Sequence, residues 1–264
     1  MRLARRILVV SAVVTLGVAA APSSGAQTPT VTSVIGAADG LSADIDVEEG
    51  ISPVAEDVGA LDTLTLGPLP TVTLPPEGGS VTEQVLDLDE VVTGIVGIGL
   101  TADLLRTSAE GALGPDGFAT AETTVANLAV TELIEELGAQ QLGTFIEAEA
   151  VTATCAADLE GVSGSTTLVN ATVLGQTLEE EPAPNTEIPI MIVGASASVT
   201  LNQQVENPDG SLSVTALVVD VSVSDVFSAS LEIGPATCGV VEGLEVPAAP
   251  VVPVPVQVTP RFTG

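Results

Sequence analysis

Short runs in which apolar side chains alternate with hydroxyl or acidic side chains recur along this sequence. Residues 43–48 place Ile45 and Val47 on one face and three carboxylates on the other. A period of two is typical of a β-strand with one buried and one solvated face. The same period is found in five further runs, which are 61–66, 71–74, 198–201, 211–214 and 219–224. Glycine and proline separate these runs, so we expect an all-β chain of short antiparallel strands.

The clearest predicted hairpin joins residues 199–205 to residues 212–219 through the turn at 206–211. Within this turn, Pro208 presets φ for the first central position and Gly210 is free to take a positive φ. The turn accounts for the polar residues Asn207 and Asp209 better than a metal-binding loop does.

One stretch departs from the β pattern. Residues 131–138 begin with a Thr suited to an N-cap, carry acidic residues in the first turn and end at Gly138, which predicts one short helix. Residues 57–61 and 91–106 are apolar runs, the second of them interrupted by glycine. Periodicity alone does not distinguish helix from strand in such runs, and we interpret both as strands.

The composition supports a packed fold rather than a disordered chain. The chain has 264 residues, of which 45% are hydrophobic and only 15% are charged. Aromatic residues make up 2%, so the core is expected to be aliphatic. This length suits one large β domain. We therefore predict an antiparallel β-sandwich with Greek-key or jelly-roll-like strands.

The first 26 residues have the pattern of an export signal. Three arginines within the first six positions precede an apolar run at 7–21, and small residues at 24–26 offer a cleavage site after Ala26. The apolar run is shorter than a membrane-spanning helix requires. The arginine pair at positions 5 and 6 loosely resembles a twin-arginine signal, and an ordinary basic region explains it equally well, which leaves the export route open.

The expected domain boundaries follow from these features. Residues 1–26 form the signal, residues 27–245 form one β-sandwich domain, and residues 246–264 form a Pro- and Val-rich extended tail. We expect no stable membrane span after the signal is removed, and a secreted or extracellular location, with retention at the cell surface as a variant of it.

The residue inventory excludes several chemistries. The chain has no His, and all five of its basic residues are Arg, so it cannot build a Ser-His-Asp or Cys-His site or a Schiff-base lysine. A formal charge of -30 also repels phosphate backbones, and we therefore expect no nucleic-acid partner. The expected partner is an extracellular or cell-envelope component that the sequence does not identify.

Signal removal leaves two arginines against 35 acidic residues, so most carboxylates must face water or bind external cations. A solvated acidic surface is one interpretation, and a calcium site is the alternative, since oxygen ligands suit calcium. Apart from calcium, the sequence predicts no cofactor, and it predicts no catalytic residue. The candidate calcium ligands are Asp44, Asp46, Glu48, Asp87, Asp89 and Glu90, with Glu49 beside the first group and Glu179, Glu180 and Glu181 as a further run. None of these groups matches an EF-hand loop.

Cys155 and Cys238 are the two cysteines of the chain, and an even count in an exported protein predicts one disulfide. Two buried free thiols are the alternative. A redox role is disfavoured, because the chain has no Cys-x-x-Cys sequence and no nearby base to lower a thiol pKa.

An enzyme is the least favoured class. Glu147 and Glu149 are the most suggestive carboxylate pair for glycoside hydrolysis, although alternate residues of a strand simply share one face. Sugar-processing clefts also add aromatic rings, which this chain almost wholly lacks. Asn170 begins a formal glycosylation sequon, which has meaning only in a eukaryotic secretory pathway.

An ordered series of segments resembles the bacterial choice-of-anchor P family. The series runs through residues 147–156, 164–168, 184–186, 201–204 with 209–212, and 236–239, and the similarity covers roughly residues 31–240. The resemblance implies a secreted or cell-surface protein of Gram-positive bacteria with a domain of uncharacterised function, and it carries over no active-site residue. Family members with a sorting signal show Leu-Pro-x-Thr-Gly, a hydrophobic span and a basic tail. Here the sequence ends at residues 260–264 without that pattern, so we expect release or non-covalent retention.

The sequence thus predicts an exported, acidic, disulfide-closed β-sandwich that acts as a structural or adhesion-type binding module. A calcium-dependent adhesion or assembly protein is the first alternative, and a hydrolase with two carboxylates is the second.

Overall fold

The computed structural model describes residues 28–47, 63–88, 99–131, 144–192, 195–223 and 227–244. Within these ranges the chain forms β-strands and no helix. The strands are β1 (Pro29–Val47), β2 (Thr63–Thr73), β3 (Gly79–Leu88), β4 (Gly99–Ala112), β5 (Phe118–Thr131), β6 (Thr144–Asp158), β7 (Gly161–Val169), β8 (Thr172–Val173), β9 (Gln176–Thr177), β10 (Thr186–Ile192), β11 (Ala195–Glu206), β12 (Leu212–Val223) and β13 (Phe227–Leu244).

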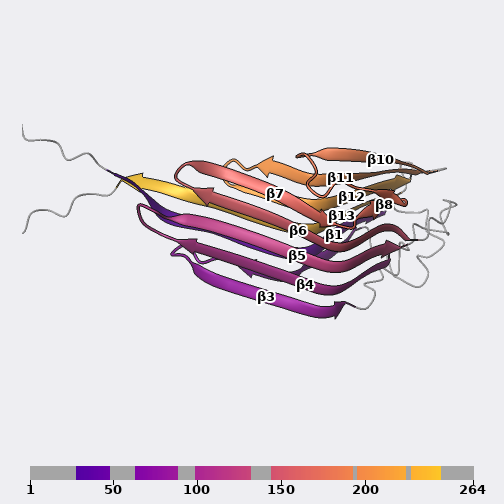
Figure 1. Cartoon of the computed structure of the whole chain (residues 1–264), viewed down its shortest axis with the longest axis horizontal. Coiled ribbons are helices and arrows are strands. Elements are labelled where there is room, and N and C mark those ends of the chain that lie inside the picture. The colour runs from indigo at the N-terminus through magenta and orange to yellow at the C-terminus, as the bar shows by residue number, and fades with distance from the viewer. Residues whose placement is uncertain are drawn as a thin grey trace, which may run out of the picture. The chain divides into compact units, whose positions relative to one another are not determined.

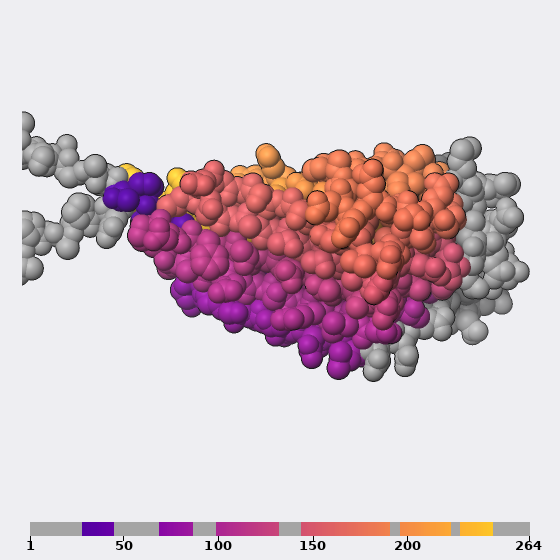
Figure 2. All heavy atoms as spheres, viewed as in Figure 1, coloured from indigo at the N-terminus to yellow at the C-terminus, as the bar shows by residue number. Residues whose placement is uncertain are grey.

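The strands form two antiparallel sheets that lie face to face (Figure 1). The first, here called sheet A, has the order β10-β11-β12-β13-β1-β2. The second, sheet B, has the order β3-β4-β5-β6-β8-β9, and β7 also pairs with β6. Figure 2 shows the sheet B side, where the colour passes from purple to salmon as β3 to β7 follow one another. The predicted all-β antiparallel sandwich is therefore confirmed.

The strand order is that of two meanders. Every neighbouring pair in sheet A is consecutive in the chain except β13 and β1, and the chain changes sheet only between β2 and β3 and between β9 and β10. The Greek-key or jelly-roll connection expected from the sequence is thus absent from the described strands. Its place is taken by the long pairing of β1 with β13, which runs from Pro29 opposite Leu244 to Val47 opposite Phe227. This pairing brings the two ends of the sandwich domain side by side.

The core lies between the sheets and is built from small aliphatic residues. Along β5 and β6 every second residue is buried over most of the strand, as the period of two predicts. Phe145, Leu105 and Leu128 are among the largest fully buried side chains, and alanines fill many other inward positions. Small side chains let the sheets approach closely: a Cβ added at Gly164 of β7 would lie 2.2 Å from Cγ2 of Val214 on β12.

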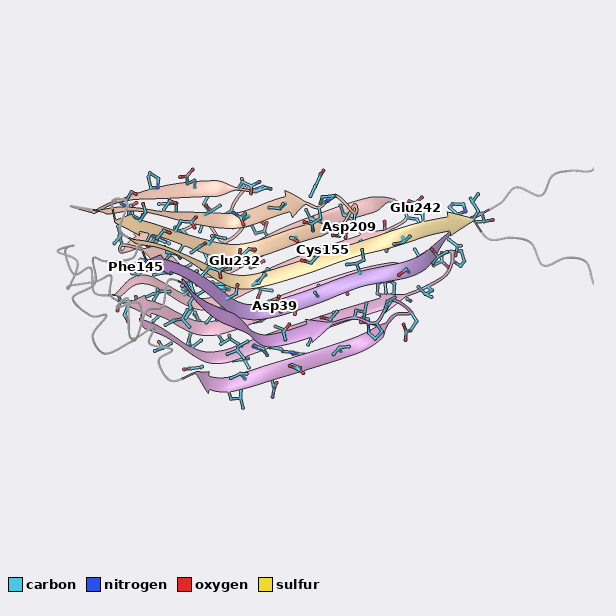
Figure 3. The ribbon with its side chains drawn as sticks, turned by 180° about the vertical axis from the view of Figure 1, so that it is seen from behind. Asp39, Phe145, Cys155, Asp209, Glu232 and Glu242 are labelled. Atoms are coloured by element: carbon cyan, nitrogen blue, oxygen red, sulfur yellow. A yellow bond between two sulfur atoms is a disulfide. The ribbon has the colours of Figure 1, made fainter. Side chains whose placement is uncertain are left out.

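The two cysteines form the predicted disulfide. Cys155 on β6 is joined to Cys238 on β13, with 5.6 Å between their Cα atoms, and both residues are fully buried. The bond therefore ties sheet B to sheet A (Figure 3). Because it closes a loop with a sequence separation of 83, the chain-entropy relation gives a stabilisation of about 4.6 kcal/mol.

Buried threonines add polar contacts between the sheets. The hydroxyl of Thr123 on β5 donates toward the backbone carbonyls of Pro235 at 3.0 Å and Asp39 at 3.2 Å, both in sheet A. Its cross-strand neighbour on β4, Thr107, is equally buried, yet its hydroxyl has no hydrogen-bond partner. Thr107 and Thr123 are therefore equally buried, but of the two hydroxyls only that of Thr123 forms hydrogen bonds.

The predicted hairpin at 199–219 is confirmed. β11 pairs with β12 up to Glu206 opposite Leu212, and the turn between them is closed by the amide of Asn207, which donates to the carbonyl of Ser211 at 2.8 Å. Gly210 has a φ of 83°, the positive value expected of it. The strand expected over 91–106 is confirmed from Gly99 onward as the first part of β4.

Several predicted features lie outside the described residues. They are the export signal at 1–26, the run at 57–61, the part of the run at 91–106 that precedes Gly99, the short helix at 131–138 beyond its first residue, and the tail at 246–264. The residues from Thr28 to Glu245 form one compact unit.

Candidate functional site

The described members of the two groups of candidate calcium ligands lie in different sheets. Asp44 is exposed on β1 of sheet A, and Asp46 follows on the same strand, opposite Ser228. Asp87 belongs to β3, at an edge of sheet B. Glu48, Glu49, Asp89 and Glu90 lie outside the described residues. Asp44 and Asp87 therefore do not belong to the same sheet.

The remaining acidic candidates are exposed. The run at Glu179–Glu181 lies between β9 and β10, where the backbone carbonyl of Glu180 accepts a hydrogen bond from the amide of Leu168. Within the described ranges, no group of three or more His, Cys, Asp or Glu side chains is arranged to hold a metal ion.

Glu147 and Glu149 lie on the solvent face of β6 in sheet B. Both are exposed, and the residue between them, Ala148, is buried, so the two carboxylates share one face as expected of alternate strand residues. Glu149 accepts a hydrogen bond of 2.6 Å from the side-chain amide of Asn170, which gives this carboxylate a structural role. Asn170, the sequon residue, is itself exposed.

The outer face of sheet A contains a broad groove of about 600 Å³. Its floor and walls come from β10, β11, β12, β13 and β1. Figure 3 shows the molecule from the side of sheet A, with Glu232 of β13 labelled. The lining contains the acidic residues Asp44, Glu187 and Asp220, together with Ser196, Ser198, Ser222, Ser228 and Ser230.

The strand register places these side chains in rows across the sheet. In one row, Ser198, Asp220, Ser230 and Asp44 are successive partners on β11, β12, β13 and β1. In the adjacent row, Ser196 pairs with Ser222, and their hydroxyls are 2.7 Å apart. In the first of these rows, carboxylates therefore alternate with serines.

Basic side chains do not neutralise this groove from within the described part of the chain. The one basic residue there is Arg106, which is exposed on β4 in sheet B. The groove therefore presents carboxylate and hydroxyl oxygens, which accept hydrogen bonds and attract cations. Chemically it can bind a cationic group.

The sequence pattern identified the strands of the groove but not the groove itself. The alternation predicts strands over residues 219–224 and 198–201, but it does not predict that Glu187 and Asp220 line one groove with Asp44. That these residues line one groove depends on the order of β10, β12 and β1 in sheet A. The detectable signal was the Ser-x-Ser and Asp-x-Ser spacing in three separate runs.

A polar network that the sequence also did not reveal fixes the side of the sandwich near β7. Asn202 on β11 is buried and has a φ of 50°. Its side-chain amide donates to the carbonyl of Pro182 at 2.9 Å, and its side-chain oxygen accepts from Gln204 at 3.0 Å and from Thr166 at 3.3 Å. Gln204 also donates to the carbonyl of Gly164 at 2.9 Å, which links β11 to β7. Because every contact is internal, the network is structural.

Among the carboxylates of the described residues, that of Asp209 has a shifted pKa, and the cause of the shift is a turn. Asp209 accepts hydrogen bonds from the hydroxyl of Ser211 at 2.7 Å and from its amide at 3.0 Å. These contacts, the side-chain one first, hold the pKa of Asp209 below its ordinary value of 3.8. The shift therefore has its cause in the hairpin turn that the sequence predicted at residues 206–211.

Comparisons with protein-family models, with curated proteins and with solved structures found no match. In the described part of the chain, no helix has the length and apolar character needed to cross a membrane.

Proposed function

We propose that this protein is an exported structural or binding module that acts outside the cytoplasm without catalysing a reaction. The observation that carries the proposal is the buried disulfide between Cys155 and Cys238, which covalently joins the two sheets. Disulfides of this kind form and persist in oxidising compartments, where exported proteins fold. The export pattern of residues 1–26 supports the same location.

The position of the domain ends supports presentation at a surface. Pro29 and Leu244 are opposite each other in the β1–β13 pairing, so the chain enters and leaves the sandwich at one end. A domain held in this way exposes both outer sheet faces and its far end to a partner. The resemblance of residues 31–240 to the choice-of-anchor P family supports the same assignment to secreted or surface proteins of Gram-positive bacteria.

The side-chain inventory supports a binding rather than an enzymatic role. The chain has no His and no Lys, and the two carboxylates proposed for hydrolysis, Glu147 and Glu149, lie on an exposed strand face outside the sheet A groove. A binding module needs only a surface of defined shape and charge, which sheet A offers.

Fractionation of a Gram-positive host that expresses the complete sequence tests the proposal. The chain is expected in the medium or the envelope fraction, with Gln27 as its N-terminal residue after cleavage behind Ala26. Variants in which Arg2, Arg5 and Arg6 are replaced by Glu serve as the export control. A chain that remains in the cytosol with Met1 and its signal retained would refute the proposal.

A further inference from the structure

The outer face of sheet A has features that select a particular kind of partner. Its groove crosses five strands and carries three carboxylates from β10, β12 and β1, separated by serine side chains. It is concave, and the described chain offers it no basic side chain of its own. Charge complementarity therefore favours a cationic partner for this face.

The register fixes the spacing that such a partner must match. Asp220 and Asp44 lie in one row with Ser230 between them, so two strand spacings separate their backbones. At about 4.8 Å per strand the separation is about 9.6 Å. On β10, Pro189 is the partner of Ser198 and ends this row, and Glu187 lies two residues further along β10, opposite Thr200.

An extended polypeptide of polyproline type matches this spacing. It has three residues per turn and a rise of about 3.1 Å per residue, so every third side chain lies on the same side, about 9.3 Å further along. Alternate residues of a β-strand are only about 6.7 Å apart, which is too short for the acidic row. The partly exposed Ser198 and Ser230, which lie on either side of Asp220, can donate to the unpaired backbone carbonyls of such a segment.

We propose that the sheet A groove binds an extended polyproline-type segment of a partner protein with a basic residue at every third position. This inference rests on the proposed function, because it names the class of partner that the exported module would bind. The segment lies across the strands, with its basic side chains beside Asp44 and Asp220 and its backbone along Ser198 and Ser230.

The test uses the mature chain and a synthetic peptide of Pro-Pro-Arg repeats, measured by isothermal titration calorimetry at low ionic strength. A peptide of the same composition with its arginines in one block is the spacing control. The double variant Asp44→Asn, Asp220→Asn removes the acidic row. The double variant Glu110→Gln, Glu122→Gln removes the same charge from exposed positions on sheet B and is the matched control. Far-UV circular dichroism verifies that each variant is folded.

The repeat peptide is expected to bind more tightly than the block peptide. The sheet A variant should weaken its binding about five- to tenfold, the range that two solvent-exposed charge contacts supply, and the sheet B variant should weaken it less than about twofold. Equal weakening by both variants would mean that overall charge alone attracts the peptide, and would overturn the inference. Equal affinity for both peptides, or no binding at all, would overturn it as well.

These outcomes are separate from those of the proposed function. A chain that is exported and processed but fails to discriminate the peptides refutes only the groove assignment. A chain that stays in the cytosol refutes the function, whatever it binds in solution.

Discussion

The paired threonines Thr107 and Thr123 offer a direct test of how the sandwich is held together. They are cross-strand neighbours on β4 and β5, and both are fully buried. Thr123 donates across the core toward two carbonyls of sheet A, whereas the hydroxyl of Thr107 has no partner. Replacing each with Val exchanges a hydroxyl for a methyl group of similar size, so the two variants differ mainly in the hydrogen bond that is lost.

The expected effects have opposite signs. Thr107→Val removes a buried hydroxyl that has lost its hydration without gaining a partner, and we expect it to raise the free energy of unfolding by about 1 kcal/mol. Thr123→Val removes an inter-sheet hydrogen bond, and we expect it to lower that free energy by about 1 kcal/mol. For a domain of this size, a difference of about 2 kcal/mol between the variants separates their Tm values by about 4 to 8 °C.

Differential scanning calorimetry suits this comparison, because the chain has no Trp or Tyr to report unfolding by fluorescence. Urea unfolding followed by far-UV circular dichroism provides the free energies independently. If Thr107→Val destabilises the domain as much as Thr123→Val, the Thr107 hydroxyl has a partner in solution, and the reasoning from these contacts is refuted.

Four further results are expected. Replacing both Cys155 and Cys238 with Ala should lower the free energy of unfolding by about 4.6 kcal/mol and the Tm by about 9 to 18 °C, and a Tm unchanged in calorimetry would contradict the inter-sheet link. Gly164→Ala places a Cβ 2.2 Å from Val214 and should destabilise the domain by about 1 to 3 kcal/mol in urea unfolding. Adding Val214→Ala should cost less in that background than in the wild type, and strict additivity would show that the two positions do not touch. Because the folded-state pKa of Asp209 lies below 3.8, its stabilising contribution is present above 3.8 and is lost as the pH falls through the lower folded value. The stability difference between wild type and Asp209→Asn should therefore shrink on acidification, and a difference that grows would argue against the turn contacts. Calcium should raise the Tm no more than magnesium does at equal concentration, because both screen the same repulsion between carboxylates, and a calcium-specific rise would favour the calcium-dependent alternative.

The sequence predicted those features that depend on neighbouring residues. Alternation over residues 43–48 and 219–224 places residues in strands, and the Pro208 and Gly210 positions define a tight turn, because both effects act within a few residues. The pairing of Cys155 with Cys238 followed from the absence of any other cysteine.

Features that depend on strand order were beyond the sequence pattern. Asp44, Asp220 and Glu187 are far apart in the chain, and only the pairing of β1 with β13 and the β10-β11-β12 meander bring them to one groove. The same pairing replaced the expected Greek-key or jelly-roll connection. Local alternation is identical in both topologies, since it records which face of a strand is buried and not which strand lies beside it.

The state of the two cysteines in protein taken from its producing cell tests the central claim most directly. Free thiols are trapped with an alkylating reagent at the moment of lysis, and the peptides that contain Cys155 and Cys238 are then identified by mass spectrometry without reduction. The claim that this is an exported sandwich with covalently joined sheets predicts one cross-linked peptide pair and no alkylated cysteine. Recovery of Cys155 and Cys238 as two alkylated thiols would contradict it.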